Sequence, residues 1–150
     1  DFFATFADIL DKTGEIPDNA AEDSFSFYPS LKGEKEAIRP FTIHHSIRGQ
    51  FAIRKGDWKL ILTDDNGGGW DLLWETPRTK ANIVQLYNLK NDPGETRNLE
   101  ESHPGVIKEL VDDLAQALHR GRTTPGKPQS NDGWPYQDQT TRNQYPQLNP

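Results

Sequence analysis

The sequence predicts an α+β fold, in which a small antiparallel sheet of about four strands packs against a C-terminal helix. An N-terminal helix and an extended C-terminal arm complete it. Apolar residues recur at helical spacing over residues 2–10 and 104–119, and short alternating runs lie between these two segments. The composition changes near residues 40 and 121. We therefore divide the chain into residues 1–40, 41–121 and 122–150.

The N-terminal helix is predicted over residues 2–10. Its apolar face consists of Phe2, Phe3, Phe6, Ile9 and Leu10. Asp1 stands at the capping position, and Gly14 is expected to end the helix. A face this apolar must pack on something, and we expect the partner to be a domain upstream. Because the chain also starts without Met, we interpret it as a piece of a longer protein.

The sheet is predicted from four runs of strand-forming residues, namely 41–47, 50–54, 58–63 and 83–89. Phe51 and Ile53 alternate with smaller or charged residues, so one face of their strand should be buried. Gly56 lies in the short turn to the next strand. After the last strand, Pro93 is followed by Gly94, which is typical of a type II turn.

The C-terminal helix is predicted from Pro104 to His119, with Ser102 as its N-cap and Gly121 just past its end. Its apolar stripe consists of Ile107, Leu110, Val111, Leu114 and Leu118. Residues 122–150 are rich in Pro, Gln and Asn. This composition favours an extended arm that lies across a surface.

Charge and composition exclude several classes of function. Lys and Arg number 17 against 23 Asp and Glu, a net charge of −6, so no nucleic-acid partner is expected. No run approaches the roughly 18 apolar residues of a membrane span, so no membrane partner is expected. The absence of Cys excludes disulfides and thiolate chemistry within these residues.

The densest group of chemically active side chains is His44 and His45 with the nearby Arg48. Neighbours on a strand point to opposite faces, so both His cannot ligate one metal, and at most one should reach any given cleft. Such a His could donate a hydrogen bond to an anionic oxygen or act as a general acid. The alternative is that one ring is packed and the other is solvated.

The glycines at 67–69 and Trp70 allow two interpretations: a flap that stacks on a sugar, or a hairpin tip with a packed Trp. The preceding Asp64, Asp65 and Asn66 do not fit an EF-hand loop, because Gly68 occupies the fifth position and no Glu stands at the twelfth. We predict no metal site here. Nothing in these residues by itself amounts to a catalytic centre.

Four groups of residues occur in an order and at a spacing that match one family: 1–10; 49–54 with 56–61; 86–89 with 92–95 and 98–99; and 121–126 with 129–132. Together they resemble the C-terminal part of sulfatases, the arylsulfatase family of the alkaline phosphatase superfamily. The resemblance covers nearly the whole chain.

The resemblance implies a parent enzyme that hydrolyses sulfate esters with a formylglycine, made from Cys or Ser, and a calcium ion. Neither group is expected on this chain, which has no Cys. Its only Ser-x-Pro begins at Ser102, with Val106 where the family motif needs Arg. The string Asp65-Asn66-Gly67 imitates a metal-binding motif but lies after the hairpin, not before the first helix. The resemblance further implies an N-terminal catalytic domain as partner, a sulfated small molecule or glycan as substrate, and a periplasmic or secreted location.

On this interpretation the chain forms pocket walls, with His44, His45, Arg48 and Trp70 as substrate-binding residues and no catalytic residue. The isolated chain is then expected to have little or no activity. One alternative is a module that binds glycans or proteins through Trp70, Trp74 and the aromatic residues of the arm. Another is a phosphodiesterase of the same superfamily, which an upstream Thr or Ser nucleophile would indicate.

Overall fold

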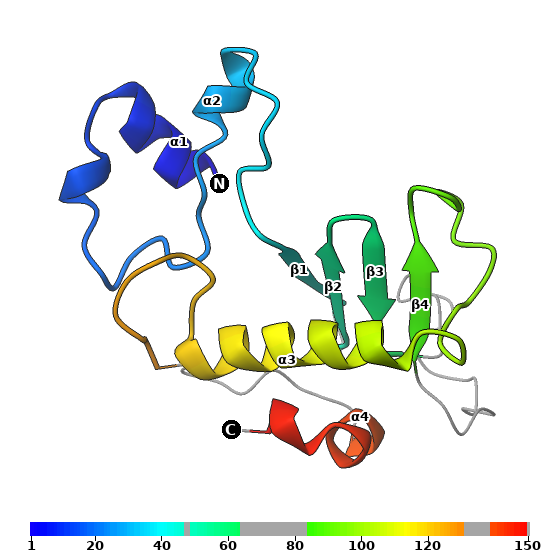
Figure 1. Ribbon diagram of the computed structural model, residues 1–150. Coiled ribbons are helices and arrows are strands. Elements are labelled where there is room, and N and C mark those ends of the chain that lie inside the picture. Colours follow the sequence, from blue (N-terminus) through cyan, green and yellow to red (C-terminus); the bar gives the residue numbers. More distant parts are fainter. Residues whose placement is uncertain (47–48, 64–83, 131–138, 150) are drawn as a thin grey trace. The chain divides into compact units, whose positions relative to one another are not determined.

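The computed structural model describes residues 1–46, 49–63, 84–130 and 139–149. These residues belong to two compact units, which are described separately (Figure 1). The N-terminal unit comprises Asp1–Pro40 and Gln116–Asp132, and the sheet unit comprises Phe41–Ala115 and Gly133–Pro150. Within the described ranges, no helix is both long and apolar enough to cross a lipid bilayer.

The sheet unit contains an antiparallel sheet of four strands in the order β1-β2-β3-β4, as the sequence predicts (Figure 1). The strands are β1 (Thr42–His45), β2 (Phe51–Lys55), β3 (Trp58–Ile61) and β4 (Gln85–Asn88). Gly56 has a φ of 56° in the turn between β2 and β3, a conformation that glycine adopts without strain. The sheet is therefore a simple meander in which sequence neighbours pair.

The register gives the sheet one apolar and one mixed face. Ile53 pairs with Leu60, and Leu60 pairs with Leu86; none of these three side chains is exposed. Directly paired residues share a face, so this row defines the apolar face. His44, Ala52 and Ile61 belong to the alternate row and project from the opposite face.

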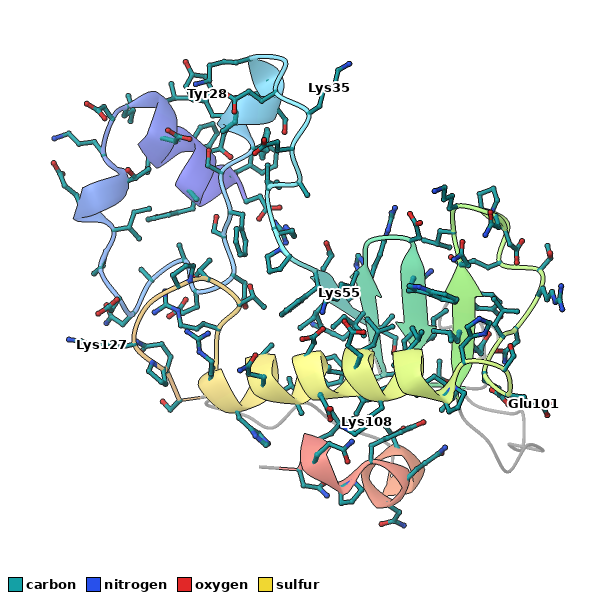
Figure 2. All side chains as sticks on the ribbon, viewed as in Figure 1. Tyr28, Lys35, Lys55, Glu101, Lys108 and Lys127 are labelled. Atoms are coloured by element: carbon teal, nitrogen blue, oxygen red, sulfur yellow. The ribbon has the colours of Figure 1, made fainter. Side chains whose placement is uncertain are left out.

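Helix α3 (Pro104–Arg120) contacts the apolar face through residues of its first half. The Lys55 ammonium lies 2.8 Å from Glu109 Oε1 and 2.7 Å from Asp113 Oδ2, between the sheet and the helix (Figure 2). The Trp58 and His103 rings lie 4.9 Å apart. Buried members of the predicted stripe include Leu110, Val111 and Leu114.

Two local predictions at turns are wrong. Glu95, not Gly94, has a positive φ of 54°, so the segment is not a type II turn. The Asp92 carboxylate accepts hydrogen bonds from the Thr96 and Arg97 N–H groups and draws the chain into a longer turn. Ser102 is not the N-cap of α3: its hydroxyl donates to the Leu99 carbonyl at 3.0 Å.

In the N-terminal unit, α1 (Phe2–Ile9) is followed by the 3-10 helix η1 (Thr13–Glu15) and by α2 (Tyr28–Leu31). Gly14 lies within η1, and the left-handed residue after α1 is Asp11, with a φ of 56°. The prediction that Gly14 ends the helix is therefore wrong. Asp11 takes the left-handed conformation instead, and Asp is one of the few residues other than Gly that tolerate it.

The segment predicted as an extended arm contains helical structure in the sheet unit. Helix α4 (Gln139–Gln144) is followed by η2 (Pro146–Leu148), and the Leu148 side chain has no exposed surface. In the N-terminal unit, Arg122 is buried and its guanidinium donates to the carbonyls of Asp18 and Lys127. The segment 122–150 thus contributes buried residues to both units.

Candidate functional site

A pocket of about 290 Å³ lies at the end of the sheet where β1 leads into β2. The residues that line it are His44, His45, Ser46, Gln50, Phe51, Ala52, Lys59, Ile61 and Thr63. They come from the end of β1, the start of β2, and β3 with the residues after it. The pocket therefore forms at one end of the sheet, where β1 and β3 end and β2 begins.

His44 and His45, two of the predicted site residues, both border this pocket and are both exposed. They lie in alternate rows, His44 opposite Ala52 and His45 opposite Phe51. The expectation that at most one of them reaches a cleft is wrong, because a pocket at the end of a strand meets residues from both rows.

Nδ1 of His45 lies 3.0 Å from the Ser46 carbonyl oxygen, and its ring meets the Phe51 ring edge-on at 6.3 Å. The carbonyl contact orients the imidazole, since a ring nitrogen facing a carbonyl must carry the proton. Arg48 and Trp70, the other two predicted site residues, lie outside the described residues.

A chain of hydrogen bonds holds the polar side of the pocket. Ser46 Oγ donates to Gln50 Oε1 at 3.0 Å, and Gln50 Nε2 donates to Thr63 Oγ1 at 3.0 Å. Gln85 Nε2 donates to the Thr63 carbonyl at 2.5 Å, and Tyr87 OH donates to Gln85 Oε1 at 2.8 Å. These hydrogen bonds connect Ser46, directly after β1, with residues of β4.

Tyr87, the last residue in this series of hydrogen bonds, keeps its phenolic proton over a wide pH range. Burial, followed by the negative charges of Glu95, Asp92 and Glu100, raises the pKa of Tyr87 above its ordinary value. The phenol therefore remains a hydrogen-bond donor to Gln85 at neutral pH.

Lys59 is a pocket residue that the sequence analysis did not single out. Its ammonium lies 2.6 Å from Glu95 Oε1, a residue outside the pocket lining. Alternation along β3 places Lys59 on the other face of the sheet from Trp58 and Leu60, as the sequence indicates. What the sequence could not give is the pairing of β3 with its neighbours, which brings Lys59 to the pocket of His44.

The lining suits an anion. Its described residues include one ammonium and two imidazoles and no carboxylate, while the Ser46, Gln50 and Thr63 side chains bond one another. Hydrogen bonds from such donors to an ionised oxygen are stronger than those between neutral groups. Phe51, Ala52 and Ile61 add apolar surface that an attached organic group could cover.

The described residues do not fit the calcium ion or the formylglycine that the resemblance implies. Among them no group of three or more His, Asp or Glu side chains is placed to hold a metal ion. The whole chain has no Cys, and Ser102 lies in a turn before α3. We therefore derive no reaction step through either group.

Comparisons with known proteins point to sulfatases. An N-acetylgalactosamine-6-O-sulfatase of Bacteroides thetaiotaomicron is 32% identical over 122 residues, which are 80% of this chain and 23% of the relative. An uncharacterized sulfatase of Schizosaccharomyces pombe is 38% identical over 64 residues, 43% of this chain and 9% of that protein. No protein-family model matches the chain.

A solved structure agrees. It is described in connection with the metabolism of multiple glycosaminoglycans by Bacteroides thetaiotaomicron and matches with a TM-score of 0.61 and 31% identity. The match covers 78% of this chain and 24% of that one. The chain is thus similar to sulfatases over most of its length, as the sequence predicts. It spans about a quarter of the length of the Bacteroides thetaiotaomicron relatives.

Proposed function

We propose that the chain is the part of a sulfate-ester hydrolase that forms a wall of the substrate pocket beside His44 and His45. The observation that carries this proposal is the pocket lining, which contains several hydrogen-bond donors and no carboxylate among its described residues. A sulfate ester presents ionised oxygens and an organic group, and this lining offers contacts for both. The relation to sulfatases makes sulfate the preferred anion over phosphate.

In this proposal the imidazoles bind and orient the ester, while the nucleophile and the metal belong to the N-terminal catalytic domain of the same enzyme. Formylglycine as nucleophile and calcium as the polarising ion are part of the proposal for that domain. Fixed donors aimed at the sulfate oxygens would stabilise charge that develops during the reaction. This chain's own contribution is binding and positioning.

The test is made in a sulfatase polypeptide that includes this chain. His44→Ala together with His45→Ala should lower kcat/KM for a sulfate ester by about tenfold or more. Lys55→Gln is the matched control, because Lys55 lies on the opposite face of the sheet and should leave kcat/KM unchanged. Unchanged kcat/KM in the double His variant would refute the proposal, as would clear turnover by the 150-residue chain alone.

We further propose that helix α1 docks on the catalytic domain. The helix turns its apolar face outward: Phe2 is 66% exposed, Phe3 57% and Phe6 59%, whereas Ala4 and Thr5 are buried. An apolar patch of this kind on an otherwise polar chain marks an interaction site.

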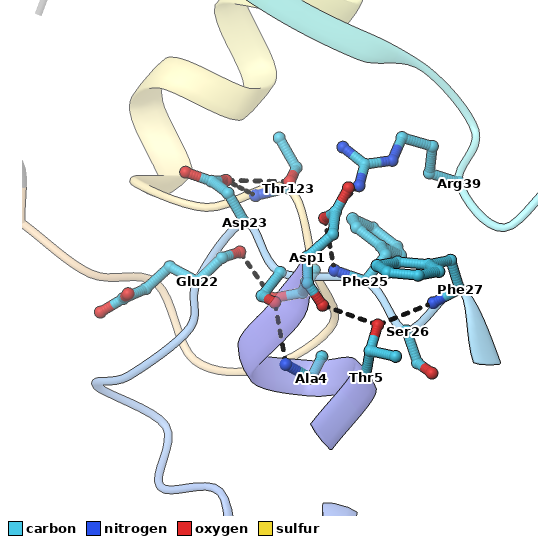
Figure 3. Close-up of polar contacts among 12 residues, drawn as sticks. Asp1, Ala4, Thr5, Glu22, Asp23, Phe25, Ser26, Phe27, Arg39 and Thr123 are labelled. Atoms are coloured by element: carbon cyan, nitrogen blue, oxygen red, sulfur yellow. Dashed lines mark hydrogen bonds and ion pairs between the residues drawn. The ribbon is translucent and has the colours of Figure 1, made fainter. Parts of the chain in front are cut away.

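Polar contacts hold α1 in this orientation (Figure 3). The Asp1 carboxylate pairs with Arg39 and accepts a hydrogen bond from the Phe25 N–H at 3.1 Å. The Thr5 hydroxyl donates to the Asp1 carbonyl and accepts from the Phe27 N–H. The segment before α2 therefore covers the polar side of the helix and leaves the apolar side accessible.

The docking proposal is tested by expressing this chain together with the catalytic domain as two polypeptides. The wild-type chain should copurify with the domain, and Phe3→Gln with Phe6→Gln should abolish copurification. Leu31→Gln, which removes another exposed apolar side chain from α2, is the matched control. Equal copurification of all three chains would refute docking through α1.

A further inference from the structure

Lys59 differs from the other described pocket residues because it is a lysine and forms an ion pair with a carboxylate. Its ammonium lies 2.6 Å from Glu95 Oε1, and the two side chains are only 25% and 30% exposed. An ammonium has three N–H donors, and within the described residues one is used by Glu95. The remaining donors can serve a ligand in the pocket.

We propose that Lys59 is the pocket residue that contacts the anionic group of the ligand, and that Glu95 limits the affinity by competing for the same ammonium. This inference rests on the proposed function only in taking the ligand to be an anion such as a sulfate ester. In this proposal Lys59 contacts the charged oxygens of the ligand, and the imidazoles of His44 and His45 are further hydrogen-bond donors.

The position of Glu95 supports a dedicated role. Its φ of 54° lies in the left-handed region, which an L-residue other than Gly rarely adopts. The Asp92 carboxylate fixes this turn through the N–H groups of Thr96 and Arg97, at 2.8 and 2.9 Å. The turn thus holds the Glu95 carboxylate beside Lys59.

Lys55 provides an internal comparison. It lies on the same strand pair as Lys59 and is also paired with carboxylates, those of Glu109 and Asp113, but it does not line the pocket. Neutralising either lysine changes the net charge of the chain by the same amount. A specific contact would involve Lys59 alone.

The test titrates inorganic sulfate into the 150-residue chain at constant ionic strength maintained with sodium chloride. Binding is followed by the NMR amide shifts of Ala52 and Ile61, which line the pocket. Lys59→Gln should raise the Kd by about tenfold, because it removes a charge-assisted hydrogen bond. Glu95→Gln should lower the Kd by about twofold to fivefold, and Lys55→Gln should leave it unchanged.

Opposite shifts in Kd for Lys59→Gln and Glu95→Gln are the signature of the proposal. It is overturned if wild type shows no saturable shift, if Lys59→Gln binds like wild type, or if Glu95→Gln weakens binding. Circular dichroism of each variant shows whether it is folded, and Lys59→Arg, which keeps the charge, should retain binding. Failure of the larger enzyme to hydrolyse sulfate esters would refute the proposed function and leave this sulfate-binding pattern unaffected.

Discussion

Gln50 Nε2 donates a hydrogen bond to Thr63 Oγ1 at 3.0 Å, and both side chains are almost completely buried, with 7% and 2% exposed. Gln50 stands just before β2, and Thr63 lies two residues beyond the end of β3. Ser46 donates to the same Gln50 side chain. One buried amide therefore connects the end of β1 with the end of β3 at the candidate pocket.

Replacing Gln50 by Leu should lower the free energy of unfolding by about 1–3 kcal/mol, because Thr63 and Ser46 would each lose a hydrogen-bond partner. Urea unfolding measures this difference. Arg54→Gln, a change at an exposed position of β2, should alter stability by no more than about 0.5 kcal/mol. A Gln50→Leu chain as stable as wild type would show that the hydrogen bond contributes nothing net.

Lys55 should stabilise the chain in a pH-dependent way. Hydrogen bonds with Asp113 and then Glu109 raise the pKa of Lys55 above its ordinary value of 10.5. The folded state thus favours the charged form, so the contribution is complete below 10.5 and is lost as the pH rises through the higher pKa of the folded state. Since the side chain is 37% exposed, we expect Lys55→Met to cost at most about 1 kcal/mol. Urea unfolding at neutral pH and above the raised pKa measures both values, and a cost that persists at high pH would contradict the argument.

Asp92 should show the opposite pH dependence. Hydrogen bonds from the N–H groups of Arg97 and Thr96 lower the pKa of Asp92 below its ordinary value of 3.8. Its contribution is therefore present above 3.8 and is lost as the pH falls through the lower pKa of the folded state.

Asp92→Ala should accordingly be less stable than wild type at neutral pH, and the difference should shrink in acid. Amide exchange of Thr96 and Arg97 should also become faster in the variant, because both N–H groups lose their acceptor. Glu101→Gln, at an exposed position, should change neither measurement. Unchanged exchange at Thr96 would contradict the assigned role.

The sequence predicts best where a pattern is local and repeated. Alternation at Phe51 and Ile53 located β2, and the apolar stripe around Leu110 located α3, because each follows from the geometry of a single element. Helix α4 was missed because its residues, Gln139–Gln144, include no apolar periodicity. Local pattern also failed at Glu95, where the Asp92 side chain, not the glycine, decides the turn.

The candidate site was predicted only in part, for a related reason. His44 and His45 attracted attention as adjacent reactive residues, but Lys59 has no such neighbour in the sequence. It reaches the pocket through the pairing of β3 with β2 and of β2 with β1, and register between strands is a nonlocal property. The roles of Arg48 and Trp70 remain predictions, since both lie outside the described residues.

In helix α1, replacing an apolar residue should cost less stability than replacing a polar one, because here the apolar residues are exposed and a polar residue is buried. Phe6 is 59% exposed, so Phe6→Gln should change the free energy of unfolding by no more than about 0.5 kcal/mol. Thr5 is 1% exposed and its hydroxyl bonds the Asp1 carbonyl and the Phe27 N–H, so Thr5→Val should cost about 1–3 kcal/mol.

Urea unfolding of the two variants measures this difference in stability. The two residues are neighbours on α1, but Thr5 is polar and buried and Phe6 is apolar and exposed. Binding of an apolar dye gives a second measure: Phe6→Gln should reduce it, since it removes exposed aromatic surface, whereas Phe2 and Phe3 remain. If Phe6→Gln were the more destabilising of the two, the apolar face of α1 would be covered by the chain itself. The helix would then have no free surface for a catalytic domain.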